Sequence, residues 1–437
     1  MKLGFSYAGQ GSQHPGMGAD LYEAYPAFRA VIDQAAADVD FDLKEVSFTD
    51  SQGVLNQTRY TQPCMVAFAA GLTAVLKEQG VVPAAAAGLS LGEYSALHAA
   101  GVFDAATAVK LVAFRGKAME EAAAGRESAM MAVLNLDRAP LQEACKEASD
   151  LGCVVIANYN CPGQLVIGGE KAAVEKAAAI AKEKGARRCL PLKVSGPFHT
   201  PLMAPAGEAL KQHFESIEFA APQIPVIFNC LGDVKPEGVS IPELLVKQVQ
   251  SSVYMEDSIR RMAAMGVDAI VEIGPGKALT GFVRKTVPEM TVYTVETVAD
   301  VENLDYASMA EGLDIGTIIN KKAIAASRIY QLMLDADVLN VTFLMSANAD
   351  VAEFVAKNDS KVTKLPVKDL KLPSDITIGG LVRGDEGMLV NGNTRIEAGD
   401  HVVVFCHGVN MKALEKYFNP PKKISAIARE LLNKLSL

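Results

Sequence analysis

The stretch AAAAGLSLGE, residues 84–93, is the most informative part of this 437-residue chain for predicting its fold. Its four alanines predict a short buried strand, and residues 88–92 have the G-x-S-x-G pattern of a nucleophile elbow. In such an elbow the serine stands on a sharp turn between a strand and a helix, where small neighbours let the two elements approach closely. We therefore expect Ser90 at the end of a strand in an α/β sheet, although the pattern by itself also fits a plain Gly-Ser turn.

The segments around this elbow alternate short apolar runs with helical patterns. Residues 3–7 predict a strand followed by a glycine-rich turn, and residues 63–79 have the apolar spacing of a buried helix. Because such alternation is typical of a parallel sheet packed against helices, we predict one α/β domain made of residues 1–126 and 196–297.

Residues 127–195 have a pattern of predicted strands and helices that differs from that of the flanking segments. They predict the order strand, helix, strand, strand, helix and strand, which is that of a ferredoxin-like subdomain. The six segments are expected at residues 129–136, 137–149, 153–158, 164–168, 171–184 and 187–194. We therefore predict that a ferredoxin-like subdomain is inserted into the α/β domain.

The composition and the predicted secondary structure change near Asp300, where β-rich segments with many Lys and Asp residues replace Ala-rich helices. We place a domain boundary at residues 297–303 and expect a solvated linker there. Residues 303–437 are predicted to form a small, separate α+β domain, with a helix at residues 321–334 and a hairpin turn at residues 384–387.

The composition disfavours several classes of function. Hydrophobic residues make up 50% of the chain and charged residues 21%, which is typical of a folded protein. The formal net charge of −9 disfavours nucleic acid as a partner. Seven Cys without a C-x-x-C pair, no secretory signal pattern and no apolar run of ~18 residues predict a reduced, cytoplasmic protein. No cluster of His, Cys and carboxylate residues has metal-ligand spacing, so we expect no metal.

A serine nucleophile needs a general base, and histidine is the usual one near neutral pH. The chain has six histidines. His199 lies in the turn-rich stretch SGPFHT after a predicted strand, where catalytic side chains are commonly displayed. We therefore take His199 as the candidate base, and expect His98 on the elbow helix to be packed or solvated.

The tetrahedral intermediate of acyl transfer needs two backbone N–H donors. The N–H of Leu91 is one expected donor, and the glycine-rich turn containing Gln10 can bring a second close to the ligand. Arg115 stands in an apolar helical stretch, where an arginine is costly unless it is paired. It forms either a buried ion pair or a two-pronged contact with a substrate carboxylate.

Together these segments resemble the malonyl-CoA:acyl carrier protein transacylase family over residues 1–297. The matching stretches are AGQGSQ at 8–13, GLSLGEYSAL at 88–97, FRGKAM at 114–119, NCPGQLVIGG at 160–169, GPFHTPLM at 196–203 and EIGPGKALTGF at 272–282. The resemblance implies a hydrolase-like α/β fold and an [acyl-carrier-protein] S-malonyltransferase of fatty acid biosynthesis. Such an enzyme moves a malonyl group from malonyl-CoA to the phosphopantetheine thiol of acyl carrier protein and uses no cofactor.

The resemblance also assigns the reacting residues. Ser90 matches the acyl-accepting nucleophile, His199 its base and Arg115 the clamp for the malonyl carboxylate. In the family a backbone carbonyl orients the histidine, so the resemblance implies a Ser-His dyad without an acidic third member, and we nominate no Asp.

Further roles follow from the same match. Gln10 and Leu91 match the oxyanion-hole positions, and Gln248 matches the residue whose backbone carbonyl orients the histidine. The chain departs from the family at Leu89 and Ala8, where many members have His and Pro. Neither change removes a catalytic atom, and Leu89 affects only the shape of the pocket.

Residues from about 303 to 420 resemble a different family, the RCK C-terminal domain of Trk-type potassium-uptake regulators. The runs IGGLVRG at 378–384 and GDHVVVF at 399–405 carry this resemblance. No G-x-G-x-x-G opens this half, so the dinucleotide-binding domain that usually precedes it is not expected. The resemblance implies a ligand-binding domain of potassium transport, which associates with itself or contacts a membrane transporter.

Two alternatives stay open from the sequence. A serine hydrolase, or a transacylase for another acyl group, would use the same serine and histidine. The uncharged acyl chain of its substrate, however, would have no carboxylate to pair with Arg115. A potassium-uptake regulatory protein with a passenger acyltransferase domain is the second alternative. Transfer of one malonyl group to Ser90 distinguishes the enzyme from both.

Overall fold

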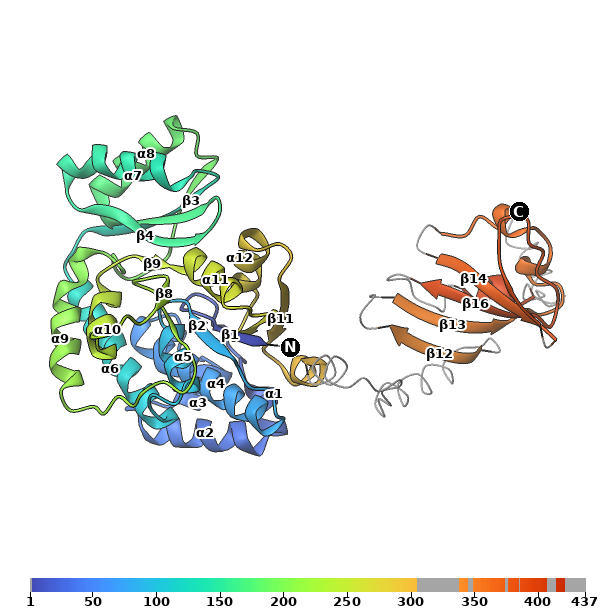
Figure 1. Cartoon of the computed structure of the whole chain (residues 1–437), viewed down its shortest axis with the longest axis horizontal. Helices are drawn as coiled ribbons and strands as arrows, with labels where there is room; N and C mark the ends of the chain where they lie inside the picture. Colours follow the sequence, from blue (N-terminus) through green and yellow to red (C-terminus); the bar gives the residue numbers. More distant parts are fainter. Residues whose placement is uncertain are drawn as a thin grey trace, which may run out of the picture. The chain divides into compact units, whose positions relative to one another are not determined.

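The structure is a computed structural model, and it describes residues 2–304, 338–344, 349–373, 376–384, 386–406 and 414–420. The chain divides into two compact units, residues 1–314 and 315–437. Each unit has sheets of its own, as Figure 1 shows.

A four-stranded parallel sheet forms the centre of the first unit, in the order β11-β10-β1-β2. Its strands are β1 (Leu3–Tyr7), β2 (Ala85–Gly88), β10 (Ala269–Ile273) and β11 (Thr291–Val295). Every residue of β1, β2 and β10 is buried, as expected for parallel strands with both faces covered. The predicted parallel α/β sheet is therefore confirmed.

Helices pack around this sheet (Figure 1). They are α1 (Ala19–Ala24), α2 (Pro26–Ala37), α3 (Leu43–Phe48), α4 (Thr58–Glu78), α5 (Gly92–Ala99), α6 (Ala105–Ala123), α9 (Ala204–Phe214), α10 (Ile241–Val249), α11 (Met255–Ala264) and α12 (Ala278–Thr286). The buried helix expected at residues 63–79 is α4, which begins earlier, at Thr58. Asp104 starts α6 by accepting a hydrogen bond from the N–H of Thr107 at 2.8 Å.

The insertion between α6 and α9 has the predicted order of strands and helices. Its elements are β3 (Ser128–Leu134), α7 (Arg138–Ala148), β4 (Val154–Cys161), β5 (Gln164–Glu170), α8 (Lys171–Glu183) and β6 (Arg188–Pro191). The sheet order is β6-β3-β5-β4-β9. Strand β9 (Val253–Tyr254) comes from the α/β part and pairs in parallel with β4, so backbone hydrogen bonds join the insertion to the rest of the unit.

The end of the first unit differs from the expectation of a solvated linker. Residues 298–304 are helical, and the side chains of Val301 and Leu304 are 0% and 2% exposed within the core of the unit. The Asp300 carboxylate accepts hydrogen bonds from the backbone of Glu296 and Thr297, so the polar residues that suggested a linker begin a helix. The predicted boundary at residues 297–303 therefore falls within a packed helix.

The second unit contains an antiparallel sheet in the order β12-β13-β16-β14-β15. Its described elements are β12 (Val338–Leu344), β13 (Ala349–Val355), β14 (Ile376–Arg383), β15 (Glu386–Leu389), β16 (His401–Cys406) and α15 (Glu415–Phe418). A core of its own includes Phe354 stacked on Phe418, with ring centroids 4.6 Å apart. The helix predicted at residues 321–334 lies outside the described residues, and the predicted hairpin turn joins β14 to β15.

Candidate active site

The elbow is built by two glycines that no other residue could replace. Strand β2 ends at Gly88 and helix α5 begins at Gly92. A Cβ on Gly88 would overlap the backbone of Gly92, and a Cβ on Gly92 would overlap the carbonyl of Tyr7. Ser90, between them, has a φ of 53°, in the left-handed region that costs a non-glycine residue ~1–3 kcal/mol. The sharp turn therefore presents Ser90 beside the N-terminus of α5, as the G-x-S-x-G pattern predicts.

The structure places His199 against the nucleophile. The Oγ of Ser90 lies 2.6 Å from Nε2 of His199, and Nδ1 of His199 lies 2.9 Å from the backbone oxygen of Gln248. A carbonyl only accepts hydrogen bonds, so Nδ1 carries the proton and Nε2 accepts from the Ser90 hydroxyl. The orienting partner is thus a backbone carbonyl and not a carboxylate.

The charge state of His199 suits a general base. The side chain is buried, and burial together with the nearby Arg115 guanidinium lowers the pKa of His199 to about 4. The imidazole is therefore neutral at pH 7, with a free lone pair on Nε2 directed at Ser90.

The guanidinium of Arg115, on α6, also lies beside the Ser90 hydroxyl, and it is fully buried. One terminal nitrogen donates to Oε1 of Gln62 at 2.8 Å, and the other donates to Oε1 of Gln248 at 3.1 Å and to Oγ of Ser90 at 3.2 Å. All these partners are neutral. Among the residues that the structure describes, no carboxylate lies within ion-pair distance of Arg115, so the alternative of a buried ion pair is not realised there.

Glu93 is a buried acid near Arg115 that could neutralise the guanidinium only in its ionised form. The side chain is buried on α5, and burial raises the pKa of Glu93 to about 8 despite the opposing effect of Arg115. At neutral pH the carboxyl group is largely protonated. The guanidinium beside Ser90 therefore keeps an uncompensated positive charge.

The glycine-rich loop after β1 packs against the elbow. A Cβ on Gly9 would meet the backbone oxygen of Leu89, so only a glycine allows this approach. The side chain of Gln10 donates to Oγ1 of Thr58 at 3.0 Å, which holds the loop in place. Within the described part of the chain, the backbone N–H groups of Gln10 and Leu91 have no hydrogen-bond partner, so both are available to a ligand.

A cavity of about 170 Å³ opens over the nucleophile between the α/β part and the ferredoxin-like insertion. Its wall is mostly apolar, with a few polar groups. The lining residues are Gln10, Leu89, Ser90, Arg115, Met119, Met130, Asn158, Asn160, Val166, Leu192, Val194, Phe198 and His199. Four of the six predicted site residues line it, while Leu91 and Gln248 lie next to Ser90 and His199 behind the wall.

The sequence arguments missed two residues of this site. Gln62 and Asn229 are buried and bond directly to Arg115 and to the elbow. The available signal was weak: each is one polar residue beside an apolar segment, Gln62 before residues 63–79 and Asn229 at the end of the run IPVIFN at residues 224–229.

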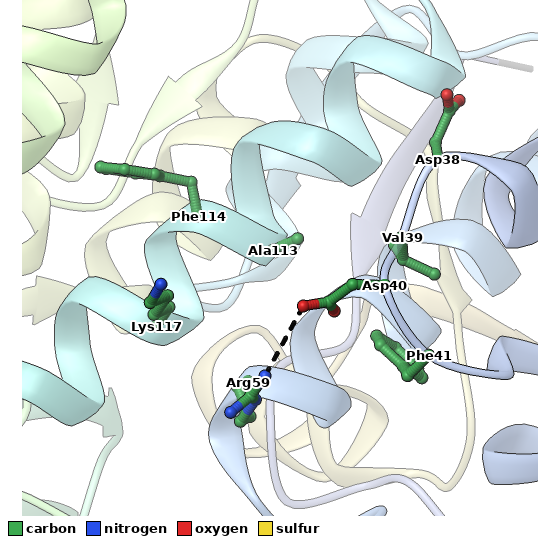
Figure 2. Close-up of a pocket in the computed structure, with 8 residues that line it drawn as sticks. All are labelled: Asp38, Val39, Asp40, Phe41, Arg59, Ala113, Phe114 and Lys117. Atoms are coloured by element: carbon green, nitrogen blue, oxygen red, sulfur yellow. Dashed lines mark ion pairs between the residues drawn. The ribbon is translucent and has the colours of Figure 1, made fainter.

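A second hollow, of about 240 Å³, lies along α6 beyond Arg115 (Figure 2). Phe114 and Lys117 of α6 border it, opposite Arg59 and Asp40. Arg59 and Asp40 form an ion pair with each other at 3.8 Å. This hollow has no serine or histidine in its lining, so the cavity over Ser90 is the candidate active site.

The described residues contain neither a metal-binding cluster nor a membrane-crossing helix. No group of three or more His, Cys, Asp or Glu side chains in these residues is arranged to hold a metal ion. No described helix combines the length and the apolar character that crossing a membrane would need.

Comparison with known proteins identifies two regions of similarity. The acyl transferase domain family matches residues 4–311, and the TrkA-C domain family matches residues 351–419. The malonyl CoA-acyl carrier protein transacylase of Bacillus subtilis is 40% identical over 307 residues, which are 70% of this chain and 96% of that protein. The Escherichia coli protein of the same name is 43% identical over 293 residues, or 66% and 94%.

A solved structure extends this similarity to the fold. It is a malonyl-transacylase in complex with a type II PKS acyl-carrier protein, and it is 37% identical in sequence. The match covers 70% of this chain and all of that chain, with a TM-score of 0.68.

Proposed function

The chain belongs to the malonyl CoA-acyl carrier protein transacylases of the acyl transferase domain family, and we propose that it carries the malonyl group on Ser90. It transfers malonyl from malonyl-CoA to the phosphopantetheine thiol of acyl carrier protein. The observation that supports the proposed mechanism is the position of the Ser90 hydroxyl, between the neutral imidazole of His199 and the guanidinium of Arg115, which no described carboxylate pairs.

Acylation starts with the Ser90 hydroxyl hydrogen-bonded to His199. Nε2 of His199 takes the proton as Oγ attacks the thioester carbonyl of malonyl-CoA. The oxyanion binds to the backbone N–H groups of Gln10 and Leu91; losing one such donor costs ~3 kcal/mol in comparable sites. Collapse of the intermediate breaks the C–S bond, and the coenzyme A thiolate leaves with the proton from His199.

Deacylation reverses these roles. His199 takes the proton of the carrier protein's phosphopantetheine thiol, and the sulfur attacks the malonyl ester on Ser90. The C–O bond then breaks, and the Ser90 oxygen takes back the proton from His199. The Gln248 carbonyl keeps Nδ1 protonated throughout, so Nε2 remains the atom that exchanges protons.

Arg115 supplies the preference for malonyl over uncharged acyl groups. A buried guanidinium with only neutral partners is unfavourable, and the free carboxylate of malonate can pair with it by two hydrogen bonds. An acetyl or a longer uncharged chain leaves the charge unpaired. This argument favours a malonyl transferase over a general serine hydrolase or a transacylase for another acyl group.

The proposed chemistry needs no resident cofactor and no metal, because side chains, backbone N–H groups and the two substrates supply every step. A cytoplasmic location is part of the proposal. None of the seven cysteines is joined in a disulfide in the described residues, which fits a reducing compartment.

The acyl-enzyme tests this proposal directly. The full chain is mixed with malonyl-CoA in the absence of carrier protein, and the intact mass and its peptides are measured. We expect one malonyl group on Ser90, which is lost when phosphopantetheinylated carrier protein is added. Malonyl retained on a Ser90→Ala protein after denaturation would contradict the proposal.

The second unit supports a second, regulatory role. Its TrkA-C match and its separate core favour a ligand-binding domain of the kind found in potassium-uptake regulation. We propose that it binds a small ligand and either associates with itself or contacts a membrane transporter. Titrating potassium salts against sodium salts in both a transferase assay and a sedimentation assay separates this role from that of the first unit.

A further inference from the structure

We infer that Asn229 is a positioning residue for the nucleophile: its side-chain amide joins the two peptide groups on either side of Leu89 and so directs the Ser90 hydroxyl. The inference rests on the proposed function of Ser90. It adds to the site a residue that is 139 positions from Ser90 in the chain and on which the geometry of the elbow depends.

The two ends of the Asn229 amide have complementary partners. Nδ2 donates to the backbone oxygen of Gly88 at 2.7 Å, and Oδ1 accepts from the backbone N–H of Ser90 at 2.6 Å. The opposite orientation of the amide would set donor against donor and acceptor against acceptor, so the chemistry of the partners fixes its direction. One rigid planar group therefore spans the turn.

The elbow needs such a support. Ser90 adopts the left-handed conformation with a φ of 53°, and non-glycine residues keep such a conformation only where their surroundings hold it. The Gly88 carbonyl and the Ser90 N–H lie between the last residue of β2 and the first residue of α5. Asn229 gives both groups the hydrogen bonds that hold this stretch in its turn.

Asn229 is itself held from three directions. It is fully buried directly after β7 (Ile227–Phe228). Its backbone N–H donates to Oε2 of Glu93 at 2.5 Å, and its backbone oxygen accepts from the N–H of Tyr254 at 2.9 Å. Because Glu93 belongs to α5, the helix that follows the elbow is tied to the residue that bridges the elbow.

The two hydrogen bonds of the Asn229 amide also determine which backbone N–H groups can donate to the oxyanion. The Ser90 N–H is bonded to Asn229 and the Ser90 carbonyl accepts from Nε2 of Gln248 at 2.7 Å, so both backbone groups of the nucleophile are occupied. The next N–H, that of Leu91, remains available. Removing the amide of Asn229 would release Ser90 to rotate away from His199, so we expect slower acylation with little change in substrate binding.

The experiment compares Asn229→Ala with Ser258→Ala in the full chain. Ser258 is a matched control because it is also fully buried and donates a hydrogen bond to a backbone carbonyl, that of Tyr254 at 2.8 Å, without touching the elbow. Three quantities are measured: the pre-steady-state rate of malonyl transfer to Ser90, the KM for malonyl-CoA and the rate of Ser90 labelling by a fluorophosphonate.

For Asn229→Ala we expect an acylation rate about 100-fold below that of the wild type, as for other small displacements of reacting groups, with the KM changed by less than about threefold. Fluorophosphonate labelling should slow in parallel, and Ser258→Ala should retain the wild-type rates. If Asn229→Ala does not fold, Asn229→Asp, which keeps the oxygen that accepts from the Ser90 N–H but has no amide donor for the Gly88 carbonyl, should fold and lose about tenfold.

An acylation rate equal to that of the wild type in the folded Asn229 variants, counted per folded molecule, would overturn the inference. A wild-type chain that shows neither malonyl nor fluorophosphonate on Ser90 would instead overturn the proposed function. The two failures are therefore distinguishable in the same set of measurements.

Discussion

His199 stays uncharged well into the acid range because it is buried beside a cationic group. Burial and the Arg115 guanidinium lower the pKa of His199 from 6.5 to about 4. Nε2 therefore remains able to accept the Ser90 proton at every pH near neutrality.

This charge state makes a prediction about pH dependence. The kcat/KM for malonyl-CoA should stay level from pH 7 to pH 6, where Glu93 is still largely protonated, and lose the base only as the pH approaches about 4. In the unfolded chain the imidazole gains its proton near pH 6.5, so the unfolded state binds more protons between pH 6.5 and about 4. The contribution of His199 to the free energy of unfolding should thus decrease as the pH falls through this window.

Two titrations check this prediction. Initial rates of malonyl transfer are measured against pH, and urea unfolding is followed at the same pH values for the wild type and for His199→Ala. A fall in kcat/KM centred near pH 6.5 would show that the imidazole has its ordinary pKa in the folded enzyme.

Arg115 allows a prediction about specificity. Arg115→Ala should lower kcat/KM for malonyl-CoA by ~2–5 kcal/mol in transition-state free energy, because a desolvated charge pair loses one partner. Transfer from acetyl-CoA should change far less, since no carboxylate reaches the guanidinium. Arg115→Lys should recover only part of the malonyl rate, because an ammonium cannot form the two-pronged contact.

The control for this specificity test lies on the same helix. Lys117 of α6 is exposed beside the hollow of Figure 2, and Lys117→Ala should leave both substrates unaffected. Equal losses on malonyl-CoA and acetyl-CoA in Arg115→Ala would mean that the arginine supports the fold of the site and does not select the substrate.

At the scale of elements, the close approach of β1, β2 and α5 depends on glycines that cannot carry a side chain. Gly88→Ala places a Cβ into the backbone of Gly92. Because backbone on both sides cannot move without separating the strand from the helix, we expect a loss of more than ~4 kcal/mol in the free energy of unfolding, or no folded protein.

Gly281 of α12 is the matched comparison. Nothing lies within 4 Å of a Cβ built at this position, and alanine is favoured over glycine inside a helix by up to ~1 kcal/mol. Gly281→Ala should therefore keep or raise the midpoint of thermal unfolding. Circular dichroism melting of the two variants checks the prediction, and a mild effect of Gly88→Ala would show that strand and helix can separate at little cost.

At the scale of the whole molecule, the chain contains two units with separate cores, and the first unit ends later than the sequence suggested. Val301 and Leu304 belong to the core of the first unit. A fragment of residues 1–314 should therefore stay folded and keep full transferase activity, since every proposed site residue lies within it.

A fragment of residues 1–297 should be less stable, because it lacks two fully buried side chains worth ~1.5–3 kcal/mol each. Steady-state kinetics and urea unfolding of the two fragments and of the full chain test both statements. Equal stability of the 1–297 and 1–314 fragments would place the end of the folded unit at the boundary read from the sequence. An inactive 1–314 fragment would show that the transferase needs the second unit.

Features that depend on neighbours in the chain could be predicted from the sequence. The glycines of residues 88–92 leave the room that the elbow needs, and short apolar runs predict buried strands. The dyad and Arg115 were found because their motifs are local and keep their spacing. The order of the elements of the insertion followed from the same local periodicities.

The contacts that these residues make depend on tertiary packing. Gln62 bonds to Arg115 across 53 positions of the chain, and Asn229 bonds to Ser90 across 139 positions. No periodicity relates residues so far apart, because their meeting depends on how helices and strands pack. The same holds for the charge of Arg115, which no described carboxylate pairs. It also holds for residues 298–304: their polar start suggested a linker, but Val301 and Leu304 pack in the core of the first unit.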